Sequence, residues 1–371
     1  MFIRKYLSLL VLPIDMNPEQ NKNQKQFEER IFPLLEDQSF DVFQRFSAII
    51  RIICSLPNEE KLNILDVGGY PGTLADFIRE MLPDASVITV DRPICPRKDY
   101  ISGSAARIPF QNETFDVVIS SDMLEHIPGG NRGETLQEIR RVSRRWIILG
   151  APFASPCNIR AERELNEIHR KAYGKSNPWL CEHIENTLPN LEETGKRLTG
   201  DSGKAVITPN GSSVSWFIMQ SLKVMMDALP LLSEKIPELN RKFNRLFGLD
   251  DLREPSYRYI ITVDKTGKIP ESVLNQHTEK QEEDNAEERI AAAAELFQGG
   301  IDLWKSLIPD ELQESGALSA GYIRQLEEII EFQEKEQKNL KTRLDSREEY
   351  LNKIESNLLF RILKKSGLLH F

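Results

Sequence analysis

Apolar residues follow two different spacings along the first two thirds of the chain. Helical spacing of apolar positions predicts helices within residues 22–56, 73–81 and 132–143. Short continuous apolar runs predict buried strands at 62–67, 86–91, 115–120 and 146–152. Because strands and helices alternate, we expect an α/β fold with a parallel sheet and helices on both faces.

The pattern changes after residue 154, where two insertions are expected. Residues 155–203 are mixed and polar, which predicts helices and loops, and further strands are expected at 204–211 and 256–267. Between those strands, residues 212–255 are rich in aromatic, Met and Leu side chains. This second insertion is expected to form a helical cap with a small core of its own; a sharper interpretation is a wall for an acceptor or a dimer surface.

The chain ends in a charged region. Residues 269–320 are expected to form an acidic linker and helices. From Ile323 onward apolar residues recur every seven positions, which predicts a coiled coil over 321–371; a single amphipathic helix packed on the domain is the alternative. The last part, 357–371, is basic and apolar, so it either contacts an anionic membrane surface or is a frayed end of the coiled coil.

Composition and charge restrict the class of protein. The chain has 371 residues and a formal net charge of -9, so it lacks the general basic field of a nucleic-acid-binding protein. Its cysteines form no CxxC pair and no zinc spacing, which indicates free thiols in a cytoplasmic protein. Residues 1–21 form an N-terminal extension whose apolar run is too short to cross a bilayer. The polar sequence after Met16 suggests that translation starts there.

The first predicted strand leads into a glycine-rich turn, Asp66 to Gly72, with the sequence DVGGYPG. The dinucleotide pattern G-x-G-x-x-G needs glycine where the chain has Tyr70 and Thr73, and no P-loop sequence is present. The turn fits the pattern acid-apolar-G-x-G-x-G with one departure, Tyr70. Glycines at such a turn let a ligand approach the backbone closely, and the following helix offers free N–H groups.

Other segments complete a family pattern. Asp91 ends the second strand, 25 residues after Asp66, and residues 103–128 read GSAARIPFQNETFDVVISSDMLEHIP. On these residues, the region 60–153 resembles a class I S-adenosylmethionine-dependent methyltransferase of type 11. The resemblance implies a Rossmann-like, seven-stranded and mostly parallel sheet, in a methyltransferase domain that spans 22–268 and includes the two insertions.

The resemblance also implies S-adenosylmethionine as the cofactor. In the family an acid at the end of the second strand binds the ribose hydroxyls, which implies this role for Asp91, since a carboxylate can accept both hydrogens of a diol. Ser104 stands where the family has an acid that bonds to the adenine amino group. Asp66 would support the turn and the cofactor's amino group, or would only cap the strand end. The other implied cofactor contacts are Gly68, Gly69, Tyr70, Gly72, Arg92, Ala105, Ser120 and Ser121.

Two histidines are candidates for a general base that removes the proton of an acceptor oxygen. His126 belongs to a Leu-Glu-His stretch near a strand end, and His183 lies in WLCEHIENTLP, where the resembled enzymes place elements that cover the substrate. The alternatives are a structural, backbone-bonded role for His126 and a polar helix face for His183. His169 is expected to be solvated, and His277 and His370 suggest no chemistry. No cluster of His, Cys and Asp indicates a metal site, so no metal ligand is assigned, although sugar-modifying members of the resembled family sometimes use a divalent ion.

These observations predict methyl transfer to an oxygen of a glycan or glycolipid precursor in surface-polysaccharide biosynthesis, because the tail is similar to tails of bacterial enzymes that build or modify such polysaccharides. The coiled coil would oligomerise the enzyme or dock it to partners, and no nucleic-acid partner is expected. One alternative is a methyltransferase for another small molecule, such as a lipid or quinone; another is a non-catalytic scaffold with the same fold. The expected location is the cytoplasm, with contact to the inner face of the membrane through 357–371.

Overall fold

The computed structural model describes residues 18–56, 61–201, 203–228, 233–249, 251–267 and 286–307. The chain forms two compact units, Met1–Lys305 and Ser306–Phe371, and nearly all described residues belong to the first. Several expectations concern residues outside the described ones and stay predictions. They are those on the start of the chain, the acidic linker, His277, His370 and the coiled coil. No helix in the described part of the chain is long and apolar enough to cross a membrane.

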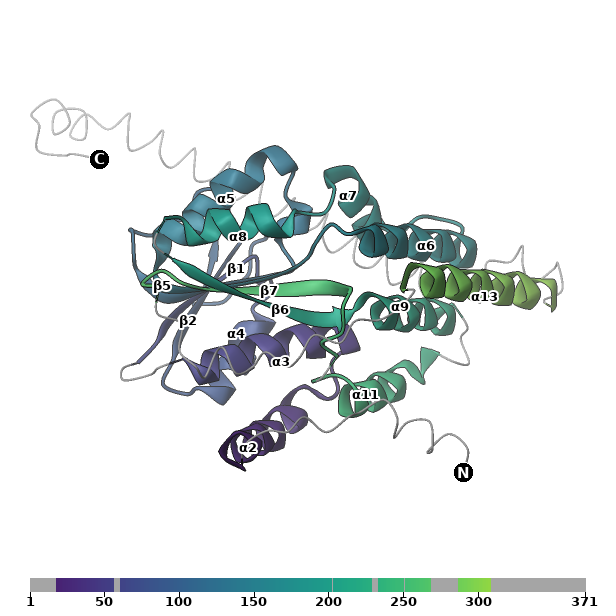
Figure 1. Cartoon of the computed structure of the whole chain (residues 1–371), viewed down its shortest axis with the longest axis horizontal. Helices are drawn as coiled ribbons and strands as arrows, with labels where there is room; N and C mark the ends of the chain where they lie inside the picture. The colour runs from purple at the N-terminus through teal and green to yellow at the C-terminus, as the bar shows by residue number, and fades with distance from the viewer. Residues whose placement is uncertain are drawn as a thin grey trace, which may run out of the picture. The chain divides into compact units, whose positions relative to one another are not determined.

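Among the described residues, seven strands form one sheet in the order β3-β2-β1-β4-β5-β7-β6 (Figure 1). In chain order they are β1 (Asn63–Val67), β2 (Ser86–Asp91), β3 (Tyr100–Ser102), β4 (Phe115–Ser121), β5 (Ser143–Pro152), β6 (Lys204–Ser212) and β7 (Ser256–Asp264). β7 runs antiparallel to both of its neighbours, and the other adjacent pairs are parallel. The expected seven-stranded, mostly parallel sheet is therefore confirmed.

The strand order reverses at β1. This strand pairs with β2 on one side and with β4 on the other, so Val67 lies opposite both Val90 and Ser120. In a parallel sheet such a switch point leaves a crevice beyond the carboxyl ends of the strands, and ligands bind there. The ends of β1, β2 and β4 therefore mark the place where a cofactor is expected.

Helices cover both faces of the sheet, as predicted. On one face lie α2 (Pro18–Leu35), α3 (Phe40–Ser55) and α4 (Thr73–Met81), and on the other α5 (Gly129–Val142) and α8 (Leu191–Thr199). Successive strand residues point to opposite faces, so Ile64 belongs to the first apolar core and Leu65 to the second. β1, β2, β4, β5 and β7 contribute to both cores, so these strands are largely apolar on both faces.

A third apolar core joins helices of the two insertions with the last described helix. Its helices are α6 (Pro156–Tyr173), α7 (Pro178–Asn186), α9 (Ser213–Asp227), α11 (Ile236–Leu246) and α13 (Ala286–Leu307). Trp216 and Phe217 of α9 are buried in this core, and α6, α9 and α13 lie side by side in Figure 1. Residues 212–255 do contain helices, but their apolar core is not their own: it is shared with α6, α7 and α13. The first unit includes most of α13.

The differences from the expected elements are local. The helix expected from residue 132 begins at Gly129, and the strand expected from 146 begins at Ser143. The sequence pattern does not predict β3, because three residues are too few to show a period. The prediction that His169 is solvated is wrong: this side chain lies on the buried face of α6, and its Nδ1 bonds to the carbonyl oxygen of Lys175 at 2.8 Å.

Candidate active site

The turn after β1 requires glycine at three positions. Gly68 has a φ of 80° and Gly72, at the start of α4, has a φ of 99°, which residues with a side chain rarely adopt. A Cβ placed on Gly69 would lie 1.9 Å from Oδ2 of Asp66. The turn is therefore built tightly around the carboxyl group near the end of β1.

Asp66 lies against this turn as a buried acid. Its side chain is fully buried, and neither carboxyl oxygen has a hydrogen-bond partner among the described residues. Burial, and to a smaller extent the negative charge of Asp91, raises the pKa of Asp66 to about 7. The carboxyl group can therefore exchange a proton near neutral pH, and a cation brought close to it would favour the ionised form.

Tyr70, the one departure from the glycine pattern, is held through its backbone. Its N–H donates to Oδ2 of Asp91 at 3.0 Å, and the N–H of Arg92 donates to Oδ1 of the same carboxylate at 2.6 Å. The Tyr70 side chain is 47% exposed, and its ring meets the ring of Tyr100 edge-on with 6.2 Å between the centroids. The tyrosine is therefore accommodated on the surface beside β3.

The remaining residues expected to contact the cofactor lie at the carboxyl ends of neighbouring strands. Ser104 and Ala105 follow β3, and Oγ of Ser104 accepts a hydrogen bond from the N–H of Ala106 at 3.3 Å. Ser120 and Ser121 end β4, and Oγ of Ser121 is buried without a hydrogen-bond partner in the part of the chain that the structure describes. The sheet register brings these positions to one edge, around the switch point.

A second group of side chains gathers after β4, where the short 3-10 helix η1 (Leu124–His126) meets α7. Asn177 caps the start of α7, because its side chain accepts hydrogen bonds from two N–H groups of the first turn. Pro178 follows at the first helical position, where proline is favourable. The guanidinium of Arg132 donates to carbonyl oxygens of η1 and of the end of α7, and Asn186 donates to the carbonyl oxygen of His126. These bonds hold α7 against η1.

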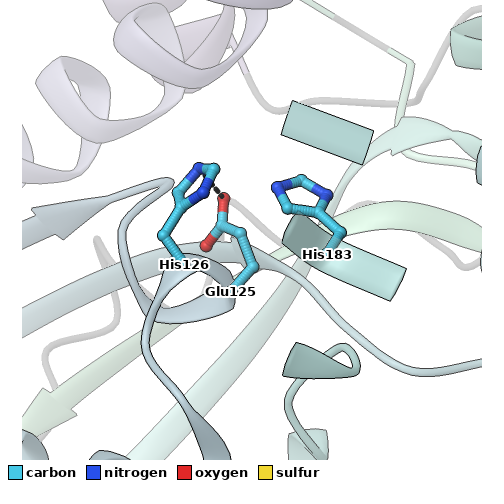
Figure 2. Close-up of side chains that lie close together, drawn as sticks. All are labelled: Glu125, His126 and His183. Atoms are coloured by element: carbon cyan, nitrogen blue, oxygen red, sulfur yellow. Dashed lines mark ion pairs between the residues drawn. The ribbon is translucent and has the colours of Figure 1, made fainter. Parts of the chain in front are cut away.

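Two imidazoles face each other across this contact, each with a carboxylate partner. Nδ1 of His126 lies 2.9 Å from Oε2 of Glu182, and Nδ1 of His183 lies 2.8 Å from Oε1 of Glu162. The centroids of the two imidazole rings are 4.7 Å apart (Figure 2). Because a carboxylate can only accept, each Nδ1 carries a proton, and in the neutral form of each ring the lone pair is then on Nε2. The His126 ring is thus bonded to a side chain rather than to the backbone, and His183 is buried rather than on a polar face.

Glu125 lies beside the two rings. Its Oε1 is 4.0 Å from Nε2 of His126, and its Oε2 is buried without a hydrogen-bond partner among the described residues. Burial, followed by the negative charge of Asp122, raises the pKa of Glu125 well above its ordinary value. One potential ligand atom from each of Glu125, His126 and His183 lies within 4.8 Å of the others. The three side chains therefore form one compact polar group.

Asp122, directly after β4, is paired with two arginines. It accepts from Arg258 through both oxygens at 2.6 Å and from Arg45 at 2.5 Å, and Arg258 also donates to Asp41 at 3.0 Å. Burial opposes ionisation of Asp122, but the charges of Arg258 and Arg45 outweigh it and hold its pKa well below the ordinary value. The φ of Asp122 is 48°, a costly conformation for a residue with a side chain, and the surrounding ion pairs hold it in place.

These groups line one cavity of about 390 Å³. Its wall includes the aromatic rings of Trp179, Trp216 and Tyr257, and the last two stack with their centroids 3.6 Å apart. Trp179 is 65% exposed, and its ring centroid lies 5.5 Å from that of His126. Polar side chains in the wall include Asn177, Gln220 and Lys223. The volume is in the range of sites for small molecules.

Sequence reasoning finds part of this cavity and misses the rest. His126 and the segment 179–183 come together, as their assignment to the substrate side suggests. Arg258 was not expected, although a charged residue inside the apolar run of β7 is a usable signal. Asp122 also has a signal, since an acid directly after a buried strand lies at the ligand-binding edge. No sequence signal identifies Glu162, because its place depends on how α6 packs.

The sheet order, the glycine turn after β1 and the acid at the end of β2 define the class I S-adenosylmethionine-dependent methyltransferase fold. The family model of the type 11 methyltransferase domain matches residues 63–146. The chain therefore carries an S-adenosylmethionine-dependent methyltransferase domain of type 11. The expected enzyme class and cofactor are confirmed.

No curated protein matches the sequence significantly. Among solved structures, the chain is similar to a putative methyltransferase from an antibiotic biosynthesis pathway of Anabaena variabilis, with 19% identity, 58% of this chain and 96% of that chain covered, and a TM-score of 0.37. A putative sarcosine dimethylglycine methyltransferase from Galdieria sulphuraria has 13% identity, coverage of 62% and 86%, and a TM-score of 0.39. A plantazolicin methyltransferase in complex with SAH has 12% identity, coverage of 68% and 91%, and a TM-score of 0.36.

Gly69→Ala is expected to disrupt the turn after β1. The added methyl group would collide with Asp66, which is fully buried and has little room to withdraw. We expect a loss of about 1–3 kcal/mol in the free energy of unfolding and S-adenosylmethionine binding weakened by at least about tenfold. Gly129→Ala is the matched control, because a Cβ there meets no atom within 4 Å. Equal behaviour of the two variants in urea unfolding and calorimetry would contradict the expectation.

Proposed function

We propose that the chain transfers the methyl group of S-adenosylmethionine to a hydroxyl oxygen of a small molecule, and that this acceptor is a glycan or glycolipid precursor of a surface polysaccharide. The observation that carries the proposal is the cavity at the end of β4, whose wall combines two oriented imidazoles with aromatic rings. Its volume of about 390 Å³ suits a small molecule or the terminal sugar of a larger one.

The residues at the ends of β1 and β2 fit the cofactor. The glycine turn leaves the backbone open to close approach, and Asp66 offers a buried carboxyl group whose oxygens have no hydrogen-bond partner among the described residues. Asp91 would hold the ribose, and Ser104 would contact the adenine. The cofactor supplies a methyl carbon bound to a positively charged sulfur, which is already a reactive donor. The protein's task is then to position the acceptor and to exclude water.

His126 is the proposed general base. A hydroxyl is a weak nucleophile until its proton leaves, and Nε2 of an imidazole can accept that proton near neutral pH. Glu182 fixes the orientation of the His126 ring through Nδ1. The His126 side chain is 27% exposed, whereas that of His183 is 9% exposed, so an acceptor reaches His126 more readily. His183 is the second candidate.

The lining of the cavity supports a sugar as the acceptor. The exposed ring of Trp179 offers a flat apolar face, and Trp216 adds a second ring. Asn177, Gln220 and Lys223 offer donors and acceptors to ring hydroxyls. A quinone or lipid would favour a wall with fewer charged and polar groups, and this contrast favours a glycan precursor.

Asp91→Ala is expected to weaken S-adenosylmethionine binding by at least about 100-fold, because charge-assisted hydrogen bonds to the ribose would be lost. The substitution also removes the acceptor of the Tyr70 and Arg92 N–H groups, so the turn loses its bond to β2. Isothermal titration calorimetry on the purified chain measures the change. Asp84→Ala, an exposed acid in the turn before β2, should bind as the unmodified chain does. An unmodified chain that binds no S-adenosylmethionine would leave a non-catalytic scaffold as the better account.

A further inference from the structure

We propose that Glu125, His126 and His183 bind a divalent transition-metal ion, such as Mn²⁺ or Zn²⁺, in the wall of the cavity. The ligand atoms would be Nε2 of both histidines and a carboxylate oxygen of Glu125. Two imidazoles and one carboxylate suit divalent ions of the first transition row and leave coordination positions open for oxygens of another molecule. Figure 2 shows Glu125 beside His126, with the ring of His183 facing both.

The distances suit ligation better than direct hydrogen bonding. Oε1 of Glu125 and Nε2 of His126 are 4.0 Å apart, which is too long for a hydrogen bond. Ligand atoms lie about 2.0–2.2 Å from such an ion, so two of them can be about 4 Å apart when they face each other across it. The potential ligand atoms of all three residues lie within 4.8 Å of one another, and a shift of about half an ångström would close the group around an ion.

Two of the proposed ligand atoms have no other use that the structure reveals. Nε2 of His183 and Oε2 of Glu125 are buried and have no hydrogen-bond partner among the described residues. Glu125 is 1% exposed and His183 is 8% exposed. Buried polar atoms are costly unless something binds them, and they are satisfied in most native structures. A metal ion between these atoms would satisfy both at once.

Both histidines are oriented in the way that metal-binding histidines usually are. Each donates its Nδ1 proton to a carboxylate, at 2.9 Å to Glu182 and at 2.8 Å to Glu162. Such a bond fixes the tautomer and leaves Nε2 for the ion. Glu162 is itself held, because the hydroxyl of Tyr257 donates to it at 2.9 Å. The outer acids thus form a second layer around the three ligands.

Metal binding does not depend on the methyl transfer proposed above, but the role of the ion does. With an ion bound, Nε2 of His126 is a ligand instead of a base. The ion would bind the acceptor oxygen and lower the pKa of its hydroxyl, whose proton would leave to solvent. This step rests on the methyl transfer proposed above, with the ion in place of His126 as the group that activates the hydroxyl.

The full chain, stripped with EDTA and dialysed, is titrated with Mn²⁺ and Zn²⁺ by calorimetry and with Co²⁺ by visible absorption. We expect one ion per chain, and binding weakened more than about 100-fold in His126→Ala and His183→Ala and at least about tenfold in Glu182→Ala, which removes an orienting acid. Glu185→Gln, an exposed acid on the same helix, is the matched control and should bind as the unmodified chain does.

No binding by the unmodified chain, or binding that both histidine variants retain, would overturn the proposal. Thermal unfolding shows whether each variant is folded. If the buried His183 does not tolerate replacement, His126→Ala decides, because its side chain is 27% exposed. S-adenosylmethionine binding is measured on the same samples without added metal. If the unmodified chain does not bind S-adenosylmethionine, the proposed function is refuted, and the metal-binding result still stands.

Discussion

Arg258→Met is expected to destabilise the domain by about 3–5 kcal/mol. Arg258 is 1% exposed, and its guanidinium donates to both Asp122 and Asp41. Methionine fills a similar volume but leaves these carboxylates without their shared cation. Asp122 then keeps only Arg45 as a partner, and Asp41 loses the cation altogether. A buried carboxylate that loses a cation costs more than the pair contributes, because the carboxylate has lost its water as well. Urea unfolding followed by tryptophan fluorescence and circular dichroism measures the change.

Arg144→Met is the matched control. It removes an exposed ion pair, so the comparison shows how much of the loss in Arg258→Met is due to burial. Arg144 also pairs with an aspartate, Asp116, but its side chain is 55% exposed, and exposed pairs contribute only about 0–1 kcal/mol. Adding Asp122→Asn to Arg258→Met should restore part of the stability, because a neutral amide no longer needs the cation. Similar losses in Arg144→Met and Arg258→Met would show that burial is not the cause.

The architecture was largely predictable because short apolar runs in the sequence mark most strands of the sheet. β1, β2 and β4 are apolar on both faces. Such strands are typical of a sheet that is covered by helices on both sides. The order of the strands was not predicted, because no periodicity tells which strand lies beside β1. β3 was not predicted, because it is a strand through its pairing with β2 and has no strand pattern in its own sequence.

The cofactor side of the site was easier to predict than the acceptor side. Asp66 and Asp91 stand at strand ends, so their position follows once the strands are known. Arg45 and Arg258 reach the cavity from α3 and β7, and Glu162 of α6 bonds to His183 in its wall. Their meeting depends on how distant elements pack.

The histidines illustrate the same limit. His126 and His183 lie far apart in the sequence, so no spacing pattern joins them, and the sequence alone gave no reason to expect a metal. Their rings meet because α7 packs against η1, through bonds made by Arg132 and Asn186. Neither Arg132 nor Asn186 carries a recognisable signal, since both act on backbone carbonyl groups.

The second large effect concerns Asp66 and depends on pH. Burial first, and the charge of Asp91 second, raise the pKa of Asp66 from 3.8 to about 7 in the folded chain. Between these values the unfolded chain has released the proton while the folded chain still holds it, so the free energy of unfolding falls as pH rises. The loss is about 1.4 kcal/mol per pH unit well below pH 7, amounts to about 2 kcal/mol between pH 5 and pH 7, and levels off by about pH 8.

Asp66→Asn removes this titration, so its stability relative to the unmodified chain should rise by about 3 kcal/mol from pH 5 to pH 8. Urea unfolding at both pH values measures the difference, in which the titrations shared by the two proteins cancel. Asp84→Asn, at an exposed position, should show a difference that does not change with pH. If Asp66→Asn behaves like this control, Asp66 is ionised in the folded chain at pH 5. The turn after β1 would then enclose a permanent negative charge, ready for a cationic cofactor without any release of a proton.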